Sequence, residues 1–173
     1  MDFVVGLAGR RGSGKTTVAT GLAAYGFKPT SFGDVVRREA ARLGLASETH
    51  VLQRIGNDLI ETWGWQHFCD EVIQVAQDAS LVVVDGFRHA DPVMQFRERF
   101  ANRFKLIFLD VEENTRVERL RAREAFDPTR DHHPVEREVD ELRRLADATV
   151  TSDSNAVEAI LRILGPSTKE HNR

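Results

Sequence analysis

Residues 9–16, GRRGSGKT, have the types and the spacing of a phosphate-binding loop, the pattern G-x-x-x-x-G-K-T. Glycines at these positions let the backbone bend so that successive N–H groups converge on phosphate oxygens at the start of a helix. In such a loop Lys15 reaches the β- and γ-phosphates, and the Thr16 hydroxyl ligates Mg²⁺. We therefore expect ATP and Mg²⁺ to bind here, through Gly9, Arg11, Gly12, Ser13, Gly14, Lys15, Thr16 and Thr17.

The sequence on either side of this loop favours a nucleotide site over a glycine-rich turn that only caps a helix. Residues 3–8 form an apolar run that is typical of a buried strand. After the loop, Val18, Leu22 and Tyr25 have the spacing of one face of a helix. The loop thus lies between a strand and a helix, which is the context that its function requires.

Three further groups of charged residues follow apolar runs that we expect to be strands. They are Asp34 with Arg37, Asp85 with Arg88, and the segment 119–123. In open parallel sheets, ligands bind beyond the carboxyl ends of the strands, so these groups should meet the phosphate loop. The planar fork of arginine suits phosphate oxygens, so Arg37 and Arg88 could hold an acceptor phosphate; the alternative is that each is a solvated surface arginine.

The elements that must position these residues alternate between strands and helices along the chain. We expect strands at 3–8, 27–31, 81–85, 106–110 and 148–151, and helices at 17–25, 34–43, 49–62, 66–77, from 91, 112–123, 134–146 and 154–164. This order predicts an α/β domain over residues 1–164 with a mainly parallel sheet and helices on both faces, the three-layer fold of P-loop NTP hydrolases. Residues 165–173 should be a polar tail.

Composition and charge limit the kinds of partner. The chain has 173 residues, of which 41% are hydrophobic and 29% charged, and a net charge of −3. With this charge we do not expect a nucleic-acid partner, since contacts to many phosphates need a surplus of basic residues. No apolar stretch suits a membrane span or a signal peptide, and the single cysteine, Cys69, should be a core residue. We expect a cytoplasmic monomer or homodimer that acts on a small-molecule nucleotide.

Several segments resemble nucleoside monophosphate kinases of the P-loop superfamily. Residues 31–37, SFGDVVR, resemble the G-D-x-x-R segment of adenylate-kinase-type enzymes, and residues 84–88, VDGFR, resemble their D-G-F-P-R segment without the proline. Residues 119–123, RLRAR, are similar to the entry to their lid, which would be 124–134 here. Residues 52–58, LQRIGND, together with residues 65–72 are similar to phage deoxynucleoside monophosphate kinases. The order of elements also resembles dephospho-CoA kinases and archaeal relatives.

The resemblance implies a role for each matched residue. Arg37 and Arg88 would bind the acceptor phosphate, Arg119 would lie against the donor base or phosphates, and Arg123 would stabilise charge on the moving phosphoryl group. Asp85, together with Thr16, would hold the metal. The acceptor would lie among the helices at 33–78, where Trp63, Trp65 and Phe68 are candidate lining residues, although Phe68 fits the core better.

For three sets of residues the sequence allows more than one role. Asp34 is a catalytic base, a substrate contact or only a helix cap. Arg10 and Arg11 contact the transferred phosphoryl group or face solvent. Asp110 ends an apolar run like that of Asp85 but matches a structural position, and His132 with His133 fit a solvated loop better than a metal site.

These features predict an ATP-dependent transfer of a phosphoryl group to a nucleoside monophosphate, preferably a deoxynucleoside monophosphate, giving the diphosphate. Lys15, Asp34, Arg88, Arg119 and Arg123 would be catalytic, and Arg37 and Trp65 would bind the substrate. Alternatives are transfer to a hydroxyl, as in dephospho-CoA kinases, a kinase of a modified base in DNA, and a non-catalytic nucleotide-binding module. No N-K-x-D segment of a GTPase switch is present.

Overall fold

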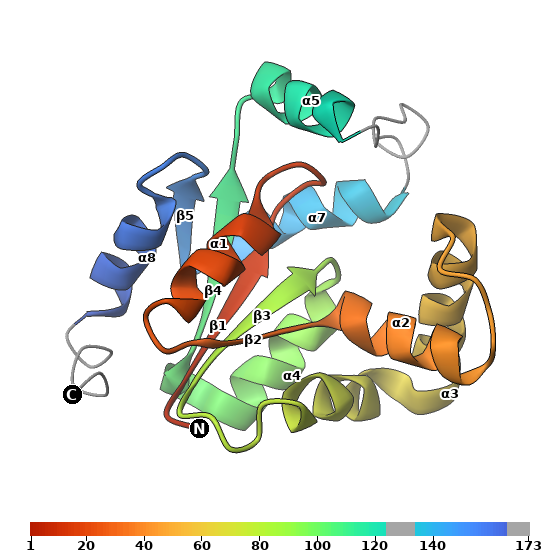
Figure 1. Ribbon diagram of the computed structural model, residues 1–173. Helices are drawn as coiled ribbons and strands as arrows, with labels where there is room; N and C mark the ends of the chain where they lie inside the picture. Colours follow the sequence, from red (N-terminus) through yellow and green to blue (C-terminus); the bar gives the residue numbers. More distant parts are fainter. Residues whose placement is uncertain (124–133, 166–173) are drawn as a thin grey trace.

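The computed structural model describes residues 1–123 and 134–165 of the chain. Within this part, five parallel strands form a sheet of order β2-β3-β1-β4-β5 (Figure 1). They are β1 (Phe3–Ala8), β2 (Lys28–Ser31), β3 (Leu81–Phe87), β4 (Phe104–Asp110) and β5 (Ala148–Thr151). Because β1 is the central strand, the phosphate loop that follows it emerges at the middle of the sheet. The predicted α/β fold class is confirmed.

Helices cover both faces of this sheet. They are α1 (Lys15–Ala23), α2 (Phe32–Arg42), α3 (Thr49–Gln74), α4 (Ala90–Phe100), the 3₁₀ helix η1 (Ala101–Arg103), α5 (Glu113–Ala122), α7 (Pro134–Leu145) and α8 (Ala156–Leu164). One apolar core joins the sheet to α1 and α8, and the other joins it to α2, α3, α4 and α7. Successive strand residues alternate between the two: Val4 belongs to the second core and Val5 to the first. The architecture has three layers.

The structure agrees with one local prediction, a break in a helix, and contradicts another, a helix cap. The break predicted at residues 63–65 is present, since Gly64 has φ 70° and ψ 166° inside α3. The interpretation of Asp34 as the cap of α2 is wrong. Ser31 occupies the N-cap, where its hydroxyl accepts a hydrogen bond from the backbone N–H of Asp34, because its extended backbone aims the side chain at the first turn.

Two predicted segments fall outside the described part of the chain. Of the expected lid at 124–134 only Pro134 is described, as the first residue of α7, and of the expected tail at 165–173 only Gly165. The histidine pair at 132 and 133 also lies outside. The proposed domain boundaries therefore stay predictions. No described helix is long and apolar enough to cross a membrane.

Candidate functional site

The phosphate loop connects the end of β1 to α1 and packs tightly against its neighbours. Gly14 precedes α1 in the left-handed conformation, with φ 83°, and a Cβ there would lie 2.7 Å from Ser152 Oγ. Gly12 has φ 81°, and its Cβ would lie 3.0 Å from the carbonyl oxygen of Arg116. Both positions require glycine, because a side chain would strain the backbone and collide with these atoms.

Lys15 and Thr16 begin α1 and lie at the carboxyl end of the sheet. The buried Lys15 donates hydrogen bonds from Nζ to the carbonyl oxygens of Gly9, at 2.6 Å, and Arg10, at 3.0 Å. Thr16 Oγ1 donates to Asp85 Oδ2, near the end of β3, at 2.8 Å. An ammonium, a hydroxyl and a carboxylate therefore lie close together where two neighbouring strands end.

Thr16 and Asp85 have the oxygen atoms that Mg²⁺ binding would need. Asp85 Oδ1 is buried and has no hydrogen-bond partner within the described residues. An unsatisfied carboxylate oxygen is costly to bury, and a hard cation with its water shell would satisfy it. No group of three or more His, Cys, Asp or Glu side chains that could hold a metal occurs in that same part. The pair thus fits Mg²⁺, which often uses one or two protein oxygens and keeps several waters.

A pocket of about 500 Å³, the strand-end pocket, lies beside the phosphate loop and between α2 and α3. Four cationic side chains line it: Arg11, Lys15, Arg37 and Arg88. Thr16, Asp85 and Trp65 line the same space. The structure therefore brings eight of the predicted site residues together, namely Arg11, Gly12, Lys15, Thr16, Arg37, Trp65, Asp85 and Arg88.

Asp34 holds one of these cations. Its Oδ1 accepts a hydrogen bond from Arg37 Nη2 at 2.6 Å, and its Oδ2 accepts one from Ser31 Oγ at 2.8 Å. Partial burial would raise the pKa of Asp34, but the hydrogen bonds from Arg37 and Ser31 outweigh it, and the pKa lies below its ordinary value. Asp34 itself is not among the residues that line the strand-end pocket, so its carboxylate acts on that pocket through Arg37.

Arg119, on α5, and Arg123, directly after α5, do not line the strand-end pocket. Arg119 donates from Nη1 to Ser152 Oγ at 3.1 Å and from Nη2 to the Ser152 carbonyl oxygen at 2.8 Å. It therefore joins α5 to the segment after β5, next to Gly14. Arg123 follows the last residue of α5, is exposed, and does not line the strand-end pocket.

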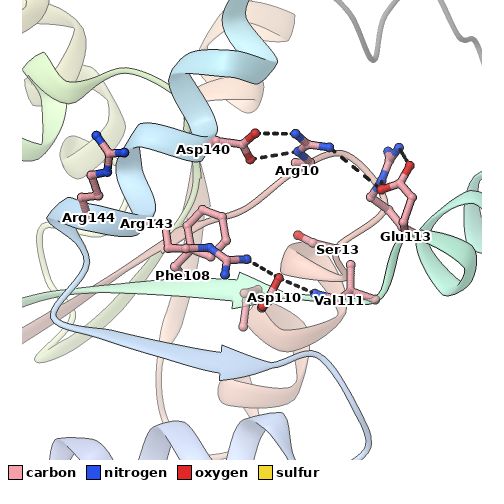
Figure 2. A pocket seen from close by; sticks show the side chains of 11 residues that line it. Arg10, Ser13, Phe108, Asp110, Val111, Glu113, Asp140, Arg143 and Arg144 are labelled. Carbon is pink, nitrogen blue, oxygen red and sulfur yellow. Dashed lines mark hydrogen bonds and ion pairs between the residues drawn. The ribbon is translucent and has the colours of Figure 1, made fainter.

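A second pocket of about 420 Å³, the rear pocket, adjoins the phosphate loop at Arg10 and Ser13, and the end of β4, α5 and α7 complete it (Figure 2). Arg10 Nε donates to Asp140 Oδ1 at 2.9 Å, and Arg10 Nη1 lies 3.9 Å from Glu113 Oε2. Asp110 accepts a hydrogen bond from Arg143. This pairing gives Asp110 a contact with α7 rather than with the strand-end pocket.

Several residues that line the strand-end pocket were not predicted as site residues from the sequence. Gln53, Asn57 and Ile60 line it from α3, and His89 lines it from the start of α4. The ring of His89 lies 5.1 Å from that of Trp65, and its Nδ1 lies 2.5 Å from Glu138 Oε2 on α7. The spacing of the three α3 residues, i, i+4 and i+7, places them on one helical face and could have indicated two amides there.

Comparison with known sequences gives one family match and several relatives. A family model described as an AAA domain matches residues 8–137, more than half of the chain. A UPF0200 protein of Pyrobaculum aerophilum is 30% identical over 174 residues, which cover 95% of this chain and 96% of the relative. A UPF0200/UPF0201 protein of Archaeoglobus fulgidus is 31% identical over 176 residues, covering 93% of this chain but 54% of the relative, so the chain spans about half of that protein's length.

Comparison with solved structures shows the fold. The TT1252 protein of Thermus thermophilus has a TM-score of 0.63 at 18% identity, covering 99% of both chains. Shikimate kinase of Aquifex aeolicus has a TM-score of 0.57 at 19% identity, covering 95% of this chain and 98% of that one. A gluconokinase of Sinorhizobium meliloti has a TM-score of 0.55 at 17% identity, covering 99% and 98%. The chain has the fold of P-loop kinases.

Proposed function

This chain belongs to the AAA-domain family and to the UPF0200 proteins, and on that premise we propose that it is a nucleotide kinase. It transfers the γ-phosphoryl group of ATP to a nucleoside monophosphate, preferably a deoxynucleoside monophosphate, and gives the diphosphate. The preference for a deoxy sugar rests on the resemblance of residues 52–58 and 65–72 to phage enzymes. An ATP-dependent enzyme with one buried free thiol, Cys69, suits the cytoplasm.

One observation carries the proposal: Arg37 and Arg88 line the same pocket as Lys15. Lys15 and the loop N–H groups suit the donor phosphates. The two arginines of the same pocket suit the phosphate of a second ligand, since a guanidinium binds phosphate oxygens in a bidentate manner. Held in one pocket of about 500 Å³, donor and acceptor phosphates would meet in line.

The charge around Asp34 favours a phosphate acceptor over a hydroxyl acceptor. A hydroxyl gains from a general base, and the efficiency of a base falls when its pKa lies far below the working pH. Asp34 has a lowered pKa and already accepts hydrogen bonds from Arg37 and Ser31. A phosphate acceptor is an anion near neutral pH and needs no base. We therefore assign Asp34 the task of orienting Arg37 toward the acceptor.

The α3 wall of the pocket favours an acceptor with a nucleobase. Gln53 and Asn57 offer amide donors and acceptors that match the edges of bases. Trp65 adds an aromatic face on which a planar ring can stack. Arginines that can bind a phosphate, together with amide and aromatic side chains that can bind a base, suit a nucleotide better than a small sugar or acid.

We assign the remaining predicted residues to the binding of the donor nucleotide. Arg119, beside Gly14 and Ser152, would contact the donor base or its phosphates, and Arg123 would reach the moving phosphoryl group from the end of α5. Thr16 and Asp85 would hold Mg²⁺, which neutralises charge on the donor phosphates when bound. Lys15 then keeps the β- and γ-phosphates in place while water is excluded.

The test is a panel of acceptors with ATP and Mg²⁺. The purified protein is incubated with each ribo- and deoxynucleoside monophosphate, dephospho-CoA and a DNA oligonucleotide, and ADP release is measured. We expect a nucleoside monophosphate to give the highest kcat/KM. Arg88→Ala should abolish acceptor binding and Asp34→Asn should leave the chemical step nearly intact. The reverse pattern would favour a hydroxyl acceptor, and no turnover with any member would leave a nucleotide-binding module.

A further inference from the structure

Two adjacent arginines of the phosphate loop, Arg10 and Arg11, line different pockets. Arg10 lines the rear pocket, where it pairs with Asp140 on α7 and with Glu113 on α5 (Figure 2). Arg11 lines the strand-end pocket, and its Nη1 atom is buried. Neither arginine belongs to the G-x-x-x-x-G-K-T consensus, so the loop pattern itself does not explain them.

The backbone at Arg11 is fixed by a buried charge on α5. Arg116, which is 2% exposed, donates from Nη1 to the carbonyl oxygen of Arg11 at 3.1 Å. Its Nε and Nη2 donate to the carboxylate of Glu113 at 2.9 and 2.7 Å. A buried guanidinium satisfied in this way is held rigidly, and it holds the start of the Arg11 side chain with it.

Within the strand-end pocket Arg11 shares the wall with donor and acceptor groups. Lys15, Arg37 and Arg88 all line this pocket. In the proposed function Lys15 binds the donor phosphates, and Arg37 and Arg88 bind the acceptor phosphate. A guanidinium that lines the same pocket as all three can contact a phosphoryl group that passes from donor to acceptor.

We propose that Arg11 is a catalytic residue that stabilises the phosphoryl group in transit, with Arg116 as its positioning residue; this inference rests on the proposed function. In the transfer, the bond between the γ-phosphorus and the β,γ-bridging oxygen breaks, and its electron pair stays on ADP. A new bond forms from an oxygen of the acceptor phosphate to the same phosphorus. Charge spread over the three equatorial oxygens is what a fixed guanidinium stabilises.

An arginine outside the pocket provides the control for the test. Arg11→Met should lower kcat by about 100-fold with little change in the KM for ATP, and Arg11→Lys should recover part of the loss. Arg38→Met removes an arginine that pairs with Glu71 and does not line the strand-end pocket, and it should leave kcat unchanged. The Arg11→Met/Arg116→Met double variant should lose no more kcat than Arg11→Met alone, since Arg116 acts through Arg11.

A binding measurement separates catalysis from loop structure. Calorimetry with ADP and Mg²⁺, with and without aluminium fluoride as the phosphoryl mimic and in the presence of the acceptor, reports the two states. Arg11→Met should keep the ADP affinity and lose the gain that the mimic gives to the wild type. Equal losses for ADP and the mimic would make Arg11 a structural loop residue and overturn the inference.

The remaining outcomes are also decisive. An active wild type whose Arg11→Met variant keeps its kcat overturns the role of Arg11 and leaves the proposed function standing. A wild type that transfers no phosphoryl group to any acceptor and gains nothing from aluminium fluoride overturns the proposed function, and the role of Arg11 with it.

Discussion

Arg37 and Arg38 are neighbours on α2 with different contacts, and they allow a test at the scale of single residues. Arg37 lines the strand-end pocket and pairs with Asp34 at 2.6 Å. Arg38 Nη2 lies 3.6 Å from Glu71 Oε2 on α3 and does not line the pocket. If the pocket holds an acceptor phosphate, only the first arginine can contribute to its binding.

We therefore predict that Arg37→Ala raises the KM for the acceptor by about 10- to 100-fold, the worth of a hydrogen bond to a charged group, with a smaller effect on kcat. Arg38→Ala should leave both constants nearly unchanged, because exposed ion pairs contribute little. Steady-state kinetics at saturating ATP measure both variants. Equal effects of the two substitutions would contradict a specific acceptor contact at Arg37.

Motif spacing predicted the cations of the pocket, but not how their partners are arranged. Arg37 and Arg88 follow strands at fixed offsets, so topology alone brings them near Lys15. The pairing of Asp34 with Arg37 depends on side-chain rotamers at the turn into α2, and the sequence contains no signal for those. Gln53 and Asn57 went unnoticed because an amide pair on a helical face is more often solvated.

At the scale of elements, the junction of β2 and α2 sets the geometry of the acceptor side. Ser31 ends β2 and caps α2 through its hydroxyl, which accepts from the Asp34 N–H at 3.0 Å. The same hydroxyl donates to Asp34 Oδ2 at 2.8 Å. One side chain therefore fixes both the first turn of the helix and the carboxylate that holds Arg37.

Ser31→Ala should lower stability and impair acceptor binding together. Loss of an N-cap costs about 1 kcal/mol, which lowers the melting temperature by about 2–4 °C in a chain of this size. The KM for the acceptor should rise, whereas the affinity for ATP should not change, because the phosphate loop is a separate segment. Thermal unfolding and ligand titration measure this, with Ser47→Ala, in the exposed segment before α3, as the control. A fall in ATP affinity would contradict this separation.

The elements themselves could be predicted where burial dictates their composition. Central parallel strands are apolar on both faces, so the runs that became β3 and β4 stand out in the sequence. The start of β4 at Phe104 lay before the predicted boundary, because its first residues, Phe104 and Lys105, do not extend the uniform apolar run. The cap of α2 was misassigned since Ser31 and Asp34 both have side chains that can cap.

At the scale of the whole molecule, Cys69 offers a probe of the fold. It is the only cysteine of the chain and lies, 4% exposed, in the core between the sheet and α3. Burial, reinforced by the nearby charge of Asp70, raises the pKa of the thiol to about 12. The thiolate is the reactive form, so the folded protein should hardly react with a thiol reagent at neutral pH.

Ligand binding should protect this cysteine if its exposure requires unfolding of the whole domain. A ligand that binds only the folded state lowers the unfolded population by a factor of 1 + [L]/Kd, about 100-fold at a ligand concentration of 100 Kd. The labelling rate of Cys69 by a chromogenic disulfide should therefore fall about 100-fold on adding ATP and Mg²⁺ at that concentration, with free cysteine as the control for the reagent. Rapid labelling of the folded protein would contradict the burial of the thiol. A slow rate that does not respond to ATP would mean that α3 opens locally while α1 and α8, which pack on the other face of the sheet, stay folded. The two cores would then be separate cooperative units.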